Sequence, residues 1–350
     1  MSPREAAGAV VGAGALAGPD ATAGRGAVVG LDIGGSKTHA VLTLGGETVA
    51  EVLAGSANPS SVGAEEAERQ LAGVLTRLLD GQPAPAHVCA GVAGADSERA
   101  RADFARLLAR HAPGAGVSVV HDSALLLAAA GLDEGIALIA GTGSVAWGRR
   151  TGVVPEGDRE ARIGGWGYLL GDEGSGYWVA RAAVRHALER LDLGDGPDRL
   201  AQDLTADCGL QDVEDLLGHF YARPERNYWA SRSRVVFELA AAGDPAANVI
   251  VAGAADALAY LVARVAGRLE CGGGAGAGGG GGKAGDDGGA RLPVVLAGGM
   301  AVNQPLLQRQ LRARLDGHGL TDVRVLDVDP VHGAARLAAQ AAAAAPSPTV

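Results

Sequence analysis

The chain has 350 residues and a formal net charge of −10 at pH 7. Such a length predicts about two domains with ample core. An acidic chain lacks the clustered Lys and Arg that bind phosphate backbones, so no nucleic acid partner is expected. Hydrophobic residues make up 47% and aromatic residues only 3%. The core is therefore expected to consist mainly of Ala, Val and Leu, which suits helices packed on sheets.

The cysteines and the N-terminus bear on the cellular compartment. Cys89, Cys208 and Cys271 are widely separated and show no metal-ligand spacing, which fits a reducing cytoplasm. Residues 1–26 are rich in Ala and Gly and lack the pattern of a secretory signal, so a disordered tail is expected. We expect no uninterrupted apolar run long enough to span a bilayer. We therefore expect a soluble protein with no membrane partner.

The first half of the chain alternates strand and helix patterns. Three successive strands are predicted, the second and third joined by the tight turn Gly45-Gly46, and then helix, strand, helix, strand and helix. The strands are expected before Gly34 and at 38–44, 47–54, 87–93 and 117–120, and the last helix at 123–130.

The second half repeats this order with helical insertions. Strands are predicted at 136–140, 145–149, 294–297 and 323–328, with several Ala-rich helices after the second, a helix at 304–315 and a last helix after Pro330. The expected domains are 27–132 and 133–345. Residues 271–291 are almost entirely Gly, Ala, Lys and Asp and predict a flexible loop without chemistry.

Two glycine-rich turns, each opened by an apolar strand, are the main functional signal. They lie at 28–38 and 136–147. Small residues allow backbone N–H groups to converge on phosphate oxygens without interference from Cβ atoms. Neither a P-loop nor a convincing dinucleotide fingerprint is present, so a nucleotide site would have to be built from such turns.

Three further features favour a ligand-binding role for these turns over a purely structural one. Asp32 ends the first strand, where a hydrated Mg²⁺ would need an oxygen ligand. Asp122 follows the strand at 117–120, where ligands collect in open α/β sheets, which favours a base over the alternative role of a helix cap. A third strand ends in Gly298-Gly299, which would let a ribose or flat ring approach the backbone.

These motifs resemble the superfamily of sugar kinases, heat-shock ATPases and actin. The resemblance implies an α/β fold of two ribonuclease-H-like domains, each a mixed five-stranded sheet with flanking helices, around a central ATP cleft. The first phosphate motif is matched at 32–38, the second at 141–144 and the adenosine motif at 296–299. The implied nucleotide contacts are Gly34, Gly35, Ser36, Lys37, Thr38, Gly141, Thr142, Gly143, Ser144, Gly298, Gly299 and Met300, with Asp32 as the Mg²⁺ ligand, through water.

A narrower match covers residues 164–178. This block looks like the N-acetylglucosamine and glucosamine kinase family, which is grouped with the ATPase subunits of benzoyl-CoA reductase. The resemblance implies Asp122 as the catalytic base. It also implies a set of amino-sugar contacts: Asn58, Asp122, Thr142, Gly165, Trp166 and Asp172.

The sequence thus predicts an ATP- and Mg²⁺-dependent transfer of the γ-phosphate to a hexosamine, most simply at its 6-hydroxyl. N-acetylglucosamine and glucosamine both stay open, as does the oligomeric state, for which a homodimer is one option. The main alternative is an ATPase that activates a redox enzyme, in which cysteines would hold an iron–sulfur cluster. A sugar-sensing regulator is disfavoured because no basic recognition segment is evident.

Overall fold

The computed structural model describes residues 26–95, 97–153, 157–270 and 292–345. Nearly all of the predicted tail and the whole predicted loop at 271–291 lie outside the described residues. The chain divides into two compact units. Unit 1 contains the residues up to Asp133 and those from Val328 onward, and unit 2 contains Glu134–Asp327.

Unit 1 is built on a mixed five-stranded sheet with the order β3-β2-β1-β4-β5. The strands are β1 (Ala27–Ile33), β2 (Lys37–Leu44), β3 (Glu47–Gly55), β4 (His87–Val92) and β5 (Gly116–His121). The first three form an antiparallel meander, while β4 and β5 run parallel to β1. The predicted fold class is confirmed for this unit.

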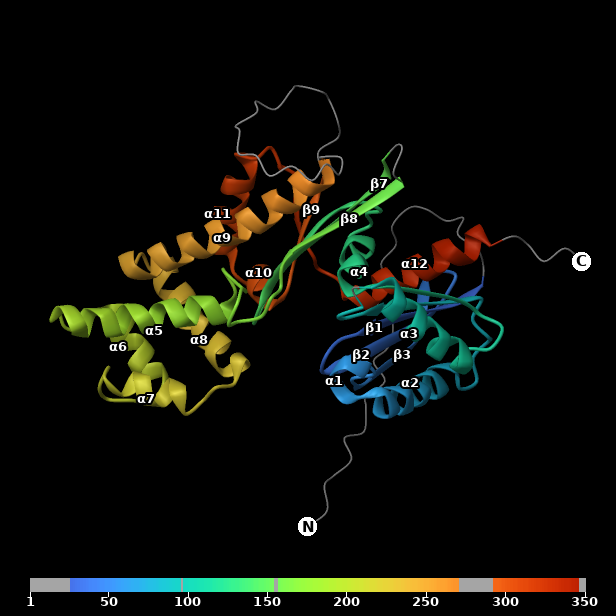
Figure 1. The fold of residues 1–350 in the computed structure, drawn as a ribbon, viewed down its shortest axis with the longest axis horizontal. Coiled ribbons are helices and arrows are strands. Elements are labelled where there is room, and N and C mark those ends of the chain that lie inside the picture. Colours follow the sequence, from blue (N-terminus) through green and yellow to red (C-terminus); the bar gives the residue numbers. More distant parts are fainter. Residues whose placement is uncertain (1–25, 96, 154–156, 271–291, 346–350) are drawn as a thin grey trace, which may run out of the picture. The chain divides into compact units, whose positions relative to one another are not determined.

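Helices cover both faces of this sheet (Figure 1). They are α1 (Pro59–Val62), α2 (Ala64–Leu79), α3 (Glu98–His111), α4 (Asp122–Ala129) and α12 (Pro330–Ala344). One core forms where α2 and α3 bury Leu75 and Phe104 against alternate residues of β1, such as Leu31. The residues between these on β1 face α12, as the contact of Val28 with Ala338 shows.

The last helix departs from the predicted domain boundary. We expected residues up to 345 to belong with the second half, but α12 packs on β1 and α4 in unit 1. The physical reason is backbone contact at two glycines. A Cβ on Gly30 would lie 2.8 Å from Val331 O, and one on Gly333 would lie 2.7 Å from Ala129 N. Only glycine allows this approach.

Unit 2 repeats the sheet with the order β10-β9-β6-β7-β8. The strands are β6 (Gly135–Ala140), β7 (Ser144–Val153), β8 (Gly157–Gly164), β9 (Val294–Ala297) and β10 (Val323–Val325). As in unit 1, three strands form an antiparallel meander and two run parallel to its first strand. The edge strand β8 was not predicted, and β10 ends three residues earlier than expected.

The helices of unit 2 include the insertions. They are α5 (Gly176–Leu193), α6 (Arg199–Asp207), α7 (Asp215–Tyr221), α8 (Arg226–Ala241), α9 (Pro245–Glu270), α10 (Gly299–Asn303) and α11 (Pro305–Asp316). No uninterrupted apolar run long enough to span a membrane was expected, and α9 contains Asp256 and Arg264, but by length and composition alone α9 could cross a membrane. However, 56% of its most apolar window is buried inside the protein, as is typical of a core helix.

We predict that Gly333→Ala lowers the free energy of unfolding by about 2 kcal/mol or more, because the new methyl group would overlap Leu125 O in α4. The matched control is Gly73→Ala, in the exposed part of α2, where a Cβ meets nothing within 4 Å. That change should instead stabilise by about 0.5–1 kcal/mol. Urea unfolding measures both, and equal effects of the two substitutions would contradict the packing described for α12.

Candidate functional site: two carboxylates and three glycine turns

The carboxyl edge of the unit 1 sheet brings the two predicted carboxylates onto one face. Asp32 on β1 pairs with Gly91 on β4, and Gly91 pairs with Val120 on β5. Asp122 lies two residues beyond Val120, at the first position of α4. Because residues in one row of a parallel sheet share a face, Asp32 and Asp122 lie on the α4 and α12 side.

The surroundings of Asp32 disfavour the ionised form of its carboxyl group. Burial raises its pKa to about 6, and the neighbouring Asp122 and Asp329 carboxylates add to the rise. His39 and Lys37 oppose it only in part. A desolvated carboxylate beside other carboxylates is suited to receive a cation, which fits the predicted Mg²⁺ role.

Asp122 shows the opposite behaviour. Burial by itself raises its pKa, but a hydrogen bond and the charge of His121, together with the Ser123 N–H, outweigh burial and leave the pKa below its usual value. His121 Nδ1 lies 2.9 Å from Asp122 Oδ1, and Ser123 N donates to the same oxygen at 2.8 Å. The N-cap of α4 is His121, so Asp122 is not the capping residue. Paired carboxyls with divergent pKa values are typical of acid–base sites.

The first glycine turn leaves its backbone accessible. Gly34 N donates to Lys37 O at 2.9 Å, and the residues Gly35, Ser36 and Lys37 are exposed. Thr38, by contrast, is fully buried, and its hydroxyl oxygen accepts a hydrogen bond from Ala57 N at 2.8 Å. Of the predicted phosphate contacts in this turn, Thr38 thus has a structural partner within unit 1.

Asn58 joins two loops at the same edge of unit 1. Its Oδ1 accepts from Ser60 N at 2.9 Å, and its Nδ2 donates to Ala93 O at 2.8 Å just after β4. The side chain is buried and forms part of the wall of a pocket of about 390 Å³, which Phe104 and Leu107 also line. These two hydrogen bonds fix the orientation of the Asn58 amide at the pocket wall.

The second glycine turn is tied to α5 and α8 in unit 2. Gly141 O accepts from Gly176 N at 2.8 Å, the first residue of α5. Thr142 Oγ1 donates to Asn227 Oδ1 on α8 at 2.9 Å. Asn227 was not predicted as part of the site, because an amide within a helical pattern gives no local signal of its partner.

Asp172 packs directly under this turn. Its Oδ1 accepts from Ser144 N at 3.3 Å, and a Cβ on Gly143 would lie 2.8 Å from its Oδ2. Asp172 has φ of 60°, the one positive value found at a non-glycine residue in the described part of the chain. Such a conformation costs about 1 kcal/mol or more, and strain of this kind is concentrated at functional sites.

The remaining predicted sugar residues lie near the same strands. Gly165 N donates to Ser144 O at 3.0 Å, which places the double-glycine loop beside the second turn. Trp166 is 73% exposed, and the Arg162 guanidinium lies 5.8 Å from the centre of its ring. The indole therefore presents a free face to solvent.

The third glycine turn adjoins the second. Gly298 follows β9 with φ of 86°, and a Cβ there would lie 2.6 Å from Ala140 O at the end of β6. Met300 is buried behind it. Two of the three predicted glycine motifs therefore share one edge of the unit 2 sheet.

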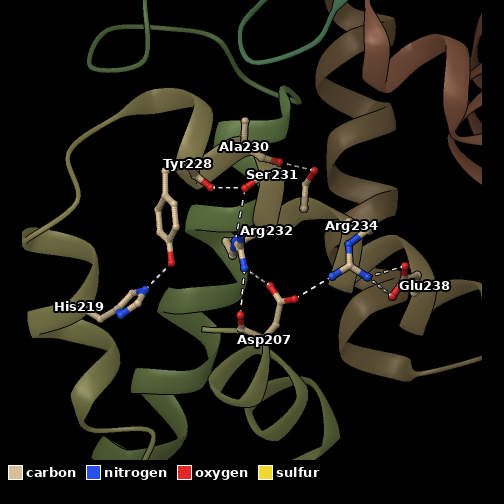
Figure 2. A network of polar contacts seen from close by, with 9 residues as sticks. Asp207, His219, Tyr228, Ala230, Ser231, Arg232, Arg234 and Glu238 are labelled. Carbon is tan, nitrogen blue, oxygen red and sulfur yellow. Dashed lines mark hydrogen bonds and ion pairs between the residues drawn. The ribbon is translucent and has the colours of Figure 1, made fainter. Parts of the chain in front are cut away.

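A polar network fixes α8, which carries Asn227 (Figure 2). Asp207 at the end of α6 accepts from Arg232 at 2.5 Å and from Arg234 at 2.7 Å. His219 Nε2 lies 2.5 Å from the hydroxyl oxygen of Tyr228. Since charge-assisted bonds to one carboxylate restrain both arginines, the network ties the middle of α8 to the end of α6.

We predict that Asp32→Asn stabilises unit 1 in a pH-dependent way. The pKa of Asp32 lies near 6 in the folded chain against 3.8 unfolded, so stability is lost as pH rises between these values. The asparagine removes this loss. The gain should be about 3 kcal/mol at pH 7.5 and smaller at pH 5. Urea unfolding at both pH values measures it, with the exposed Asp80→Asn as control; a gain independent of pH would refute the environment described for Asp32.

Comparisons with known proteins agree with this geometry. The model of the BadF/BadG/BcrA/BcrD ATPase family matches residues 29–338. The chain is 35% identical over 225 residues to an N-acetylmuramic acid/N-acetylglucosamine kinase of Clostridium acetobutylicum, covering 62% of this chain and 72% of that one. It is 28% identical over 331 residues to the N-acetyl-D-glucosamine kinase of Dictyostelium discoideum, covering 89% and 97%.

A solved structure shows the same fold. A proposed N-acetylglucosamine kinase from Chromobacterium violaceum superposes with a TM-score of 0.61 and 25% identity, covering 90% of this chain and 99% of that one. The family match spans both sheets and all three glycine turns. The chain therefore belongs to the BadF/BadG/BcrA/BcrD ATPase family.

Proposed function

We propose that this protein is an ATP-dependent amino-sugar kinase that phosphorylates the 6-hydroxyl of N-acetylglucosamine or a closely related hexosamine. The observation that carries the proposal is Asp122, a carboxylate kept ionised at the carboxyl edge of a sheet whose first strand ends in an open glycine turn. The two named kinases to which the chain is similar support the same substrate class.

The nucleotide contacts are assigned to the glycine turns of each unit. In unit 1 the exposed turn at 34–37 offers backbone amides and the Lys37 ammonium to phosphate oxygens. In unit 2 the turn at 141–144 offers further amides, and Gly299, where a Cβ would meet no atom closer than Asn303 Nδ2 at 4.0 Å, leaves room for the nucleoside. Thr38 supports the first turn from the protein interior.

Magnesium fits the electrostatics of Asp32. A cation bound with ATP would relieve the unfavourable interaction of the Asp32 carboxylate with its acidic neighbours. When bound, Mg²⁺ supplies charge neutralisation for the transferring phosphoryl group. Asp32 would hold it, through water.

Asp122 acts on the sugar. An ionised carboxylate orients the acceptor hydroxyl and takes its proton as the oxygen attacks the γ-phosphorus in line. The transition state is loose, so positioning contributes more than basicity, and a base of low pKa is adequate.

The sugar contacts are assigned on the same basis. Asn58 in unit 1, and Thr142, Gly165, Trp166 and Asp172 in unit 2, supply amide, hydroxyl, aromatic and carboxylate groups for the ring. The exposed indole face of Trp166 suits the apolar face of a sugar or an N-acetyl methyl group. N-acetylglucosamine, glucosamine and N-acetylmuramic acid are the substrates to compare.

The alternative, an ATPase that activates a redox enzyme, has less support. Cys89 is completely buried in the unit 1 sheet, where burial raises the pKa of its thiol to about 11. Cys208 is half-buried beside Tyr228 in unit 2, and burial also raises its pKa. Thiols in these environments are poor ligands for a surface iron–sulfur cluster.

Asp122→Asn should abolish sugar phosphorylation while leaving ATP affinity within about twofold of wild type, because the substitution removes the base but keeps the shape. A loss of at least 10²-fold in kcat is expected for a positioned base. Kinetics with a panel of hexoses and hexosamines, and calorimetry with ATP, measure the two effects. Activity near that of wild type would remove Asp122 from the proposed role.

Asp172→Asn should raise the KM for the amino sugar about 10- to 100-fold and leave the KM for ATP unchanged, since hydrogen bonds to a charged acceptor weaken. Asparagine tolerates the positive φ at this position, so the fold should be retained. The matched control is Glu173→Gln at the exposed neighbouring position, for which normal kinetics are expected. Equal effects at both positions would argue against a sugar contact at Asp172.

A further inference from the structure

His121 precedes the proposed base and is held against it. It is the last residue of β5 and the N-cap of α4, and its side chain is only 10% exposed, against 31% for Asp122. Its Nδ1 lies 2.9 Å from Asp122 Oδ1 and 3.2 Å from Ser123 N. A cap alone would use Nδ1 as an acceptor for the Ser123 N–H.

The distances indicate which atom carries the proton. Ser123 N lies closer to Asp122 Oδ1, at 2.8 Å, than to His121 Nδ1. If Nδ1 were bare, two acceptors would face each other at 2.9 Å, which is unfavourable in a partly buried site. With a proton on Nδ1, His121 donates to Oδ1, and Ser123 N donates to the same atom.

These contacts all reach one of the two carboxylate oxygens of Asp122. Oδ1 receives His121 Nδ1 and Ser123 N, with Ser123 Oγ at 3.5 Å. Donors to one oxygen fix the plane of the carboxylate and leave Oδ2 for another partner. The nearby Asp32 carboxylate repels the negative charge of Asp122. A hydrogen-bond donor to Asp122 therefore stabilises its ionised form.

We infer that His121 is a positioning residue for phosphoryl transfer. Its Nδ1–H holds Oδ1 of Asp122 and so directs Oδ2 to the acceptor hydroxyl. The inference rests on the proposed kinase function for its kinetic consequence, whereas the location of the proton is a property of the free protein.

The first test is independent of activity. In protein labelled with ¹⁵N-histidine, the imidazole signals of His121, assigned by their loss in His121→Asn, report which ring nitrogen is protonated. We expect a proton on Nδ1 at pH 7.5. A bare Nδ1 with the proton on Nε2 would overturn the inference, whether or not the protein phosphorylates any sugar.

The second test separates capping from positioning. Both Asn and Asp cap helices well, but only Asn retains an N–H close to the place of Nδ1. His121→Asn should keep kcat within about threefold, whereas His121→Asp should lower kcat about 10²-fold with an unchanged KM for ATP and an unchanged melting temperature. Equal kcat values for the two variants would overturn the positioning role.

A control substitution tests whether the effect is local. His87 begins β4, at the far end of the sheet from Asp122, and its Nε2 lies 3.0 Å from Ser118 Oγ. His87→Asn should leave kcat unchanged. If His121→Asp unfolds the protein, the ¹⁵N result and the kcat of His121→Asn decide the question, since a loss above 10²-fold in a folded Asn variant would also count against the inference.

Discussion

Close approach of backbones on the α4 and α12 side of the unit 1 sheet positions the candidate carboxylates. Gly30 admits α12 onto β1, and Gly333 admits α4 against α12. Gly91 on β4 accommodates the side chain of Leu125, so α4 can begin immediately at the sheet edge. The first residue of α4 is Asp122, and the residue before α12 is Asp329. The glycines therefore bring carboxylates together that would otherwise be kept apart by side-chain layers.

This crowding has an electrostatic consequence. Asp32 lies in the same row as Gly91, close enough to Asp122 and Asp329 for their charges to raise its pKa. The pKa of Asp122 is instead lowered, because His121 and Ser123 donate hydrogen bonds to its carboxylate. In the proposed kinase, the first carboxyl would hold the cation and the second would act as the base. Both carboxyl groups are partly buried, so their hydrogen bonds account for the opposite directions of their pKa values.

Much of the fold was predictable from local patterns, and the failures have identifiable causes. The hairpin at Gly45-Gly46 and the strand β9 follow directly from turn chemistry and apolar runs. Strand β8 was missed because it is an edge strand rich in charged residues, with only the alternation of Ala161 and Ile163 as a signal. The placement of α12 in unit 1 depends on tertiary contacts, which no local pattern specifies.

The same distinction applies to the site. Asp32, Asp122 and the glycine turns were proposed from their positions at strand ends. The contacts of Asn227 and His121 depend on which side chains meet in space. The positive φ of Asp172 likewise has no signature in the sequence.

The most direct measurement is a crystal structure with N-acetylglucosamine and a non-hydrolysable ATP analogue bound. The account predicts that the sugar 6-hydroxyl lies within hydrogen-bond distance of Asp122 Oδ2, and that phosphate oxygens contact backbone amides at 34–37 and 141–144. A complex in which the sugar lies away from Asp122, or the phosphates lie away from both turns, would contradict it.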